Sequence, residues 1–247
     1  MKYKEKITLA FNKGSKRYDE LADVQNIAGS LLLKELTKIF PEKQTKNIIE
    51  LGSGTGIFTK MVKDNFIFKK FDAIEISADM IRVTKKKISD KNLFYLNEDF
   101  DSFEDFNKYN LILSNMSLHW SSDIDKITEK IVDKMPKKSV FCFTVPNDES
   151  FREVENFFHL GEIKSTLNKL PSHKFIEKFF LNKNLKINTS VKKITKNYKN
   201  LINFFIELKE MGVNTSKNNH RSKLFTLRSF NSPVEISYII SCFCIKK

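Results

Sequence analysis

The length, composition and charge of the chain already exclude several kinds of protein. With 247 residues, 40% of them hydrophobic and 30% charged, the chain suits one globular domain, not a disordered or fibrous protein. No apolar run approaches the ~20 residues of a membrane helix, and residues 1–9 lack the apolar core of a signal peptide. We therefore expect a cytoplasmic protein that does not enter a membrane.

Neither the net charge nor the cysteines identify a partner by themselves. A formal charge of +13 suits an acidic protein, a nucleic acid or a membrane surface. The lysines are scattered over the chain rather than gathered in one arm, which favours an ordinary solvated surface. Cys142, Cys242 and Cys244 lack the spacing of a zinc site, so we expect core thiols and no metal.

The hydrophobic pattern predicts helices and strands that alternate along the chain. Apolar residues at helical spacing indicate a helix or helix pair over 10–36, which a polar stretch after Pro41 ends. Strands are expected at 47–51, 71–76, 93–96, 109–114 and 139–145, with helices at 78–88 and 124–135. Beyond Pro146 the pattern predicts helices at 151–160, 175–181 and 201–211 and strands at 185–198 and 235–245.

This alternation is typical of a parallel sheet with helices on both faces. Because parallel crossovers are right-handed, we predict an α/β, Rossmann-like, doubly wound and mostly parallel sheet of seven strands. We expect a single domain, with a helical cap over 1–40, a ligand-binding core over 41–146, a helical insertion or lid over 147–184, and the rest of the sheet over 185–247. Ligands of such sheets bind outside the carboxyl ends of the strands.

The strongest local signal is Glu50-Leu51-Gly52-Ser53-Gly54-Thr55-Gly56, between a predicted strand and a predicted helix. Glycines there let backbone amides approach a ligand that a side chain would obstruct. The dinucleotide-binding pattern GxGxxG has a later glycine, where this chain has Ile57 or Phe58, and here an acid precedes the first glycine. The arrangement resembles the first motif of class I S-adenosylmethionine-dependent methyltransferases. The resemblance implies that Glu50 lies near the ammonium of the cofactor's methionine.

Further signals follow in the order of that family. Glu75 ends the next strand about 20 residues beyond the glycines, where a carboxylate can accept two hydrogen bonds from a ribose. A solvated loop acid is the alternative. The resemblance implies that Ile76 borders the cofactor and that Met80 packs on its adenine, although a methionine on a helix face is more often core.

Two more segments extend the resemblance to the third and fourth strands. Residues 97–100 (NEDF) resemble the motif whose aspartate, here Asp99, meets the adenine amino group while the next residue, Phe100, packs on the ring. Ser114 and Asn115 end the fourth strand, where the family brings backbone and a polar side chain to the cofactor. The resemblance implies an S-adenosylmethionine site made of Tyr18, Glu50, Gly52, Ser53, Gly54, Glu75, Ile76, Met80, Asp99, Phe100, Ser114 and Asn115.

Longer segments reduce the number of possible methyl acceptors. The chain has neither the [DN]PPY motif of amino methyltransferases nor the Pro-Cys pair of cytosine C5 enzymes. Residues 11–25 (FNKGSKRYDELADVQ) and 113–120 (LSNMSLHW) resemble the malonyl-acyl-carrier-protein O-methyltransferases of biotin synthesis, which carry F-x-x-x-A-x-x-Y-D-x-x-A-x-x-Q and S-N-x-x-x-x-W. Gly14 stands where that family has alanine, and His119 where it has glutamine. The likeness covers about residues 9–247, although the segment between Arg228 and Pro233 is shorter than we expect of that family's C-terminal region.

The resemblance implies transfer of the sulfonium methyl to the free carboxylate of malonyl-acyl-carrier protein, giving a methyl ester that primes pimeloyl and biotin precursor synthesis. A carboxylate is ionised at neutral pH, so no general base is required. A desolvated anion needs a partner, for which Arg152 and Arg228 are candidates, with His119 as a neutral donor. Tyr18 is expected to close over the cofactor and Trp120 to line the acceptor pocket, with a plain core role as the alternative for Trp120.

The same resemblance implies an acidic carrier protein as the partner, whose charge would complement the basic surface. We expect a monomer that binds neither nucleic acid nor membrane. Two alternatives stay open. One is a methyltransferase of another small carboxylate or a quinone precursor, because the fold alone does not fix the acceptor. The other is an RNA-binding methyltransferase, which only the net charge suggests.

Overall fold

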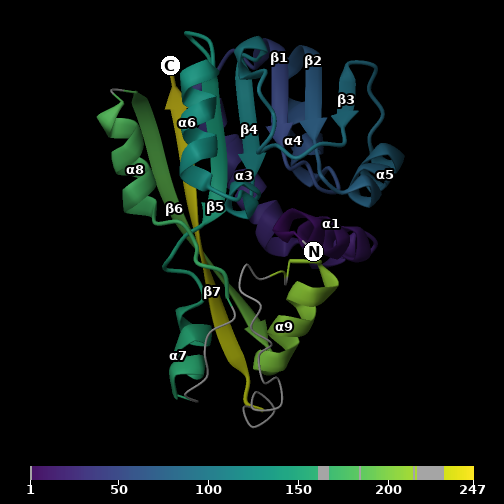
Figure 1. Cartoon of the computed structure of the whole chain (residues 1–247), viewed down its shortest axis with the longest axis vertical. Coiled ribbons are helices and arrows are strands. Elements are labelled where there is room, and N and C mark those ends of the chain that lie inside the picture. The colour runs from purple at the N-terminus through teal and green to yellow at the C-terminus, as the bar shows by residue number, and fades with distance from the viewer. Residues whose placement is uncertain (1, 161–166, 184, 214, 216–230) are drawn as a thin grey trace.

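The fold is built on one mixed sheet. In the computed structural model, the described residues are 2–160, 167–183, 185–213, 215 and 231–247. The strands are β1 (Gln44–Leu51), β2 (Ile67–Ile74), β3 (Leu93–Leu96), β4 (Leu111–Asn115), β5 (Val140–Pro146), β6 (Lys186–Tyr198) and β7 (Val234–Lys246). They form one sheet in the order β3-β2-β1-β4-β5-β7-β6, in which β7 runs antiparallel to both neighbours (Figure 1). The predicted α/β fold with a mostly parallel seven-stranded sheet is thereby confirmed.

Helices connect the strands and cover both faces of the sheet (Figure 1). They are α1 (Tyr3–Gly14), α2 (Tyr18–Leu21), α3 (Asp23–Ile39), α4 (Ile57–Asn65), α5 (Ala78–Lys87), α6 (Ile124–Lys134), α7 (Arg152–Leu160), α8 (His173–Asn182) and α9 (Leu201–Glu210). Two short 3-10 turns, η1 (Phe106–Lys108) and η2 (Leu118–Trp120), flank β4. No described helix is long and apolar enough to cross a membrane.

The N-terminal region differs from its prediction. The pattern predicted one helix or a pair over 10–36, whereas the structure has three helices, and the first begins at Tyr3. The polar run around Ser15, whose hydroxyl donates to the carbonyl of Asn12 at 2.9 Å, ends α1. Ala22, with a ψ of 34°, then separates α2 from α3. The two breaks let this region wrap around the carboxyl ends of the strands, where α1 lies in Figure 1.

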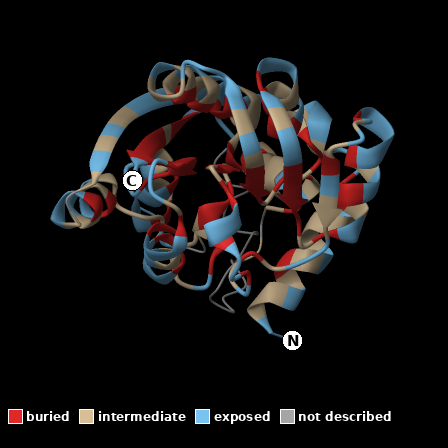
Figure 2. Ribbon diagram, turned by 90° about the horizontal axis from the view of Figure 1, so that it is seen from above, coloured by how far each residue is buried: buried red, intermediate tan, exposed pale blue. Residues whose placement is uncertain are grey.

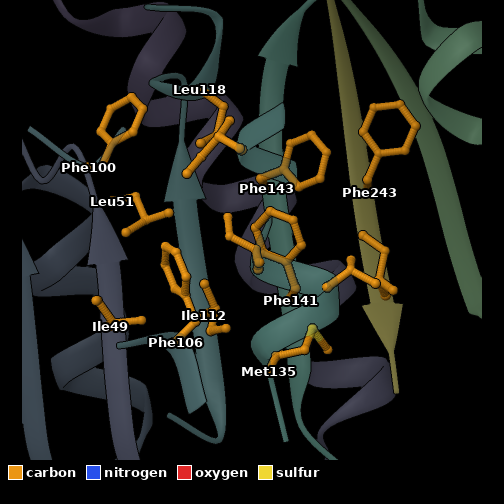
Figure 3. Close-up of a cluster of buried hydrophobic side chains, with 14 of the residues drawn as sticks. Ile49, Leu51, Phe100, Phe106, Ile112, Leu118, Met135, Phe141, Phe143 and Phe243 are labelled. Carbon is orange, nitrogen blue, oxygen red and sulfur yellow. The ribbon is translucent and has the colours of Figure 1, made fainter. Parts of the chain in front are cut away.

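The core has one layer on each face of the sheet. Ile49, Leu51, Ile112, Phe141 and Phe143 alternate along three central strands and pack against α6 and α8 (Figure 3). The opposite face packs on α3 and α4, and the three free cysteines are buried in that layer. In β1 and β2 the last four residues are buried, while the amino-terminal halves are largely exposed (Figure 2). Burial of apolar surface therefore fixes the strand ends that carry the site.

A third cluster lies at the far end of β6 and β7, two strands of 13 residues that run on beyond the rest of the sheet (Figure 1). Phe158 of α7, Phe204 of α9 and Tyr238 of β7 join Val24 and Ala28 of α3 in this cluster. The region expected as a helical insertion thus supplies α7 to this cluster and α8 to the main sheet. The same cluster ties the N-terminal helices to the last strand.

Candidate active site

A cavity of about 740 Å³, including its open mouth, lies at the carboxyl ends of β1, β2 and β4; we call it the first chamber. The residues predicted to bind a cofactor line it with one exception: Tyr18, Glu50, Gly52, Ser53, Gly54, Glu75, Ile76, Met80, Asp99, Phe100 and Asn115. The exception is Ser114, whose buried hydroxyl donates to the carbonyl of Leu51 at 2.9 Å. Ser114 therefore joins β4 to β1 and does not face the chamber.

The glycine loop forms the floor of the first chamber. The amides of Gly52 and Ser53 both donate to the carbonyl of Ile74, at 2.9 and 3.0 Å, which fixes the loop to β2. A Cβ at Gly52 would lie 1.8 Å from the hydroxyl of Ser117, so no side chain fits there. At Gly54, where φ is +56°, a Cβ would meet nothing within 4 Å. The Gly54 backbone is thus held in a left-handed conformation beside open space.

Glu50 is a buried acid in the wall of the first chamber. The hydroxyl of Thr59 donates to its carboxylate at 2.6 Å. Burial raises the pKa of Glu50 from its ordinary value near 4.5 to about 7; the Thr59 hydrogen bond opposes this rise and the negative Glu75 adds to it. A positively charged ligand group beside Glu50 would restore the ionised form.

Glu75 joins the glycine loop to the start of α5. Its two carboxylate oxygens accept from the amides of Gly54 and Ser77, both at 2.8 Å. The hydroxyl of Ser77 accepts from the amide of Met80 at 3.2 Å and caps α5. Burial raises the pKa of Glu75, and the backbone hydrogen bonds counteract that rise. The carboxylate is therefore fixed in place on the chamber wall.

Lys4 is a contributor to the first chamber that no sequence motif indicated. Its ammonium pairs with Asp99 at 3.0 Å and with Asp101 at 2.8 Å, and it lies 4.9 Å from the ring centroid of Phe100. Asn12, also on α1, accepts from the hydroxyl of Ser77 at 2.6 Å. These contacts hold α1 across the loops that follow β2 and β3.

A second chamber of about 700 Å³ adjoins the first. Tyr18, Gln25, Met116 and Trp120 line both chambers, and we call these four residues the shared wall. The described residues that complete the second chamber are His119, Pro146, Phe151, Leu167, Asn168, Leu170, Leu208, Val213 and Tyr238. Lys, Arg, Asp and Glu are absent from this described lining. Within the described lining, a ligand therefore meets no lysine, arginine, aspartate or glutamate side chain.

The structure separates the predicted acceptor-pocket residues into three groups. Tyr18, His119 and Trp120 line the second chamber together, and the ring of Trp120 packs edge-on against Phe11 at 5.5 Å. Burial raises the pKa of the Tyr18 hydroxyl, which keeps it a neutral donor. Arg152 is 66% exposed and pairs with Glu149 at 3.3 Å, away from both chambers. Arg228 lies outside the described residues.

Met116 and Tyr238 also line the second chamber, and sequence reasoning gave them no role. Met116 has a φ of +51°, unusual for a residue with a side chain, and its amide donates to both oxygens of Thr144 at 3.0 Å. The Tyr238 hydroxyl lies 3.1 Å from that of Tyr198. A strained residue beside a cavity is a signal that only coordinates provide. No cluster of three or more metal-ligating side chains occurs among the described residues.

The order of the strands, the glycine loop after β1 and the acid after β2 define a class of protein: α/β enzymes that bind a nucleoside-containing cofactor at the carboxyl ends of their strands. Residues 23–190 match the family described as methyltransferase domain. The chain belongs to this family, and the predicted enzyme class is confirmed.

Curated relatives agree with this assignment. The chain is 28% identical over 241 residues to malonyl-[acyl-carrier protein] O-methyltransferase 1 of Ilyobacter polytropus, covering 93% of this chain and 84% of that protein. It is 27% identical over 246 residues to malonyl-[acyl-carrier protein] O-methyltransferase 2 of the same organism, covering 92% of this chain and 87% of that protein. Among solved structures, magnesium protoporphyrin IX methyltransferase from Synechocystis, with bound S-adenosylmethionine, superposes with a TM-score of 0.60 at 10% identity, covering 100% of this chain and 98% of that one.

Proposed function

We propose that the chain transfers the methyl group of S-adenosylmethionine to the free carboxylate of malonyl-acyl-carrier protein. The observation that carries the proposal is a pair of adjoining chambers with a shared wall: Glu50, Glu75 and Asp99 line the first, and the described lining of the second has no lysine, arginine, aspartate or glutamate. The names of the two Ilyobacter relatives, which match nearly the full chain, support this acceptor.

The residues of the first chamber fit S-adenosylmethionine. Glu50 would hold the ammonium of its methionine part, and Glu75 would accept from the ribose hydroxyls. Asp99 would accept from the adenine amino group, with Phe100 and Met80 against the ring. The hydroxyl of Ser53 is buried without a hydrogen-bond partner in the described structure, and the open space at Gly54 leaves room for a ligand to reach it. When bound, the cofactor supplies an electrophilic methyl group on a sulfonium.

The second chamber suits an acceptor that arrives with its nucleophile already ionised. Acidic and lysine side chains are absent from the described lining, where His119 is the side chain best suited to act as a general base. A malonyl carboxylate has a pKa near ~4 and needs no base at neutral pH. Trp120, Phe151 and Leu208 exclude water around it, which removes solvent from the nucleophile. The chain then has to align the two reactants, and alignment alone accounts for large rate gains.

The net charge of +13 complements an acidic carrier protein, which would accelerate encounter. Phosphopantetheine would deliver the malonyl group through the second chamber. We also propose that the protein acts as a monomer and needs no metal.

The test is transfer of radiolabelled methyl from S-adenosylmethionine to malonyl-acyl-carrier protein, with acetyl-acyl-carrier protein, malonyl-coenzyme A and bulk RNA in parallel. We expect a base-labile ester on malonyl substrates alone. Label on RNA, or no label on any malonyl substrate despite measured cofactor binding, would refute the acceptor. The ratio between carrier protein and coenzyme A would show how far the basic surface contributes.

A further inference from the structure

The side-chain oxygen Oε1 of Gln25 is a polar atom on the shared wall that has no hydrogen-bond partner in the described protein. This atom is buried, and the Gln25 side chain borders both chambers. Leaving a buried amide oxygen unpaired costs free energy, so such a group signals a ligand that pairs with it. Gln25 appeared in the sequence as the last residue of a family pattern, without a role.

The backbone of Gln25 is held at this position by the ends of two strands. The side-chain amide of Asn115, at the end of β4, donates to the Gln25 carbonyl at 3.0 Å. The side-chain oxygen Oδ1 of Asn115 accepts from the hydroxyl of Thr144 in β5 at 2.7 Å. Thr144 in turn binds the amide of Met116 on the shared wall. Gln25 is therefore fixed relative to the two strand ends between which the chambers meet.

The proposed function places opposite charges on the two sides of this wall. A sulfonium cofactor in the first chamber is positive next to the group it donates, and a malonyl carboxylate in the second chamber is negative. An arginine or lysine on the wall would repel the cofactor, and a glutamate would repel the acceptor. A glutamine amide is neutral and carries both an acceptor oxygen and two N–H donors, so it satisfies both ligands.

We propose that Gln25 bridges the two substrates, its amide N–H donating to the acceptor carboxylate and its carbonyl oxygen facing the positive end of the cofactor. This inference rests on the proposed function. A neutral donor also suits the reaction, because methylation removes the charge of the carboxylate. A cation would stabilise the charged reactant more than the transition state, whereas the hydrogen bond from a neutral N–H weakens less as the charge of the carboxylate disappears. Gln25 is thus a positioning residue that selects an anionic acceptor.

The other polar members of the shared wall fit this role. Tyr18 and Trp120 each present one neutral donor, an O–H and an indole N–H. The indole N–H only donates, and the Tyr18 hydroxyl donates and accepts through a single oxygen, whereas the Gln25 amide carries its donor and its acceptor on separate atoms. The shared wall can therefore hold a carboxylate through neutral hydrogen bonds, and the Gln25 amide can present separate atoms to the two chambers.

The test uses three variants of Gln25 in the full chain, with binding as the readout. The first measurement is the ratio of the dissociation constants of S-adenosylmethionine and S-adenosylhomocysteine, which differ in the positive charge on sulfur. We expect Gln25→Glu to shift this ratio at least tenfold toward S-adenosylmethionine and Gln25→Lys to shift it at least tenfold the other way. Gln25→Met, similar in size and apolar, lacks the carbonyl oxygen and should shift the ratio away from S-adenosylmethionine, by less than Gln25→Lys does.

The second measurement compares malonyl-acyl-carrier protein with its malonamyl carboxamide analogue, each bound in the presence of S-adenosylhomocysteine. Wild-type protein should prefer the carboxylate, and Gln25→Glu should prefer the carboxamide. Gln25→Met should weaken carboxylate binding about tenfold while leaving the carboxamide nearly unchanged. A merely structural role would move both ligands together and would alter thermal unfolding.

Ser30 supplies a matched control because it is exposed on the same helix, α3. Ser30→Glu and Ser30→Lys carry the same charges without reaching the shared wall, so both ratios should stay within twofold of wild type. Folded Gln25 variants that keep both wild-type ratios would overturn the inference. If wild-type protein binds neither malonyl compound, the proposed acceptor is refuted. In that case, a ratio of cofactor dissociation constants that changes in the charged Gln25 variants still supports the placement of Gln25 beside the cofactor. An unchanged ratio overturns that placement.

Discussion

The two chambers differ in how the chain builds them. The glycine loop, Glu75, Asp99 and Asn115 of the first chamber lie at or directly after the ends of β1 to β4, and the N-terminal helices add residues such as Lys4. The second collects residues from α2, α3, η2, the end of β5, α9 and β7, which are separated by up to 220 positions, from Tyr18 to Tyr238. Local sequence thus determines the cofactor side, while tertiary packing determines the acceptor side. The following changes test this difference, beginning with the largest expected effect.

Replacing Glu75 should nearly abolish cofactor binding. Glu75→Ala removes the proposed ribose acceptor and also the two amide contacts that fix Gly54 and Ser77. Two charge-assisted hydrogen bonds of about 1.5–3 kcal/mol each predict a loss of at least about 100-fold in S-adenosylhomocysteine affinity by calorimetry. Ser114→Ala is the matched control, because Ser114 was predicted at the site but faces Leu51. It should cost about 1 kcal/mol of stability and leave affinity unchanged; an equal loss in both variants would contradict the distinction.

Glu50 should make cofactor binding depend on pH. Its pKa is raised to about 7, and an ammonium ligand binds the ionised form. Affinity for S-adenosylhomocysteine should therefore rise about tenfold per pH unit from pH 5 to 7 and level off above. The ligand-free protein should show the opposite trend: the folded state holds the extra proton, so this contribution to stability is present below pH ~4.5 and is lost as pH rises through about 7.

Glu50→Gln provides the check on both trends. The variant should bind the cofactor weakly at every pH, with a flat profile, and its thermal stability should no longer decline between pH 5 and 7. A profile in Glu50→Gln as steep as that of wild type would assign the titration to another group, with Glu75 as the first to examine.

These contrasts explain how much the sequence could predict. The strand ends, the glycine loop and Glu75 were predicted because strand periodicity and residue type agree at those positions, and Asp99 was predicted through its resemblance to a family motif. The amino-terminal halves of β1 and β2 were missed because neither shows apolar alternation: the first is polar, and in the second the apolar pair Ile67 and Phe68 is followed by two lysines. Lys4 was missed because a lone lysine in a basic helix carries no local signal, and its partners Asp99 and Asp101 come from a distant loop.

The second chamber was only partly predictable. Trp120 and Tyr18 were found through a family pattern, whereas Tyr238 and Met116 required the pairing of β7 and the strained turn after β4. Ser114 was assigned to the site from its place at a strand end, but alternation along β4 turns its side chain toward β1. Neighbouring residues of β4 therefore differ in role: Asn115 lines the first chamber, whereas Ser114 is buried against Leu51.

A substitution at Gly14 tests the junction between the N-terminal cap and α9, a helix that lines part of the second chamber. Gly14→Ala restores the family's usual residue and would raise helix propensity by up to about 1 kcal/mol. Here, however, the new Cβ would lie 2.4 Å from the carbonyl carbon and oxygen of Met211, which are backbone atoms. We expect a net loss of about 1–3 kcal/mol in the free energy of unfolding by urea titration. Lys13→Ala, on the exposed side of α1, should stay within about 0.5 kcal/mol.

Arg152 should show the smallest effect of all, although its charge and position made it a candidate for the acceptor carboxylate. In Arg152→Ala an exposed pair with Glu149 disappears, and such pairs contribute about 0–1 kcal/mol. The KM for malonyl-acyl-carrier protein should change less than about twofold at moderate salt, with kcat unchanged. A tenfold rise in KM that persists at high salt would mean that α7 moves to bring Arg152 into the second chamber. A rise that disappears with salt would instead place Arg152 on the docking surface for the acidic carrier, because screening weakens exposed charge contacts but leaves enclosed ones intact.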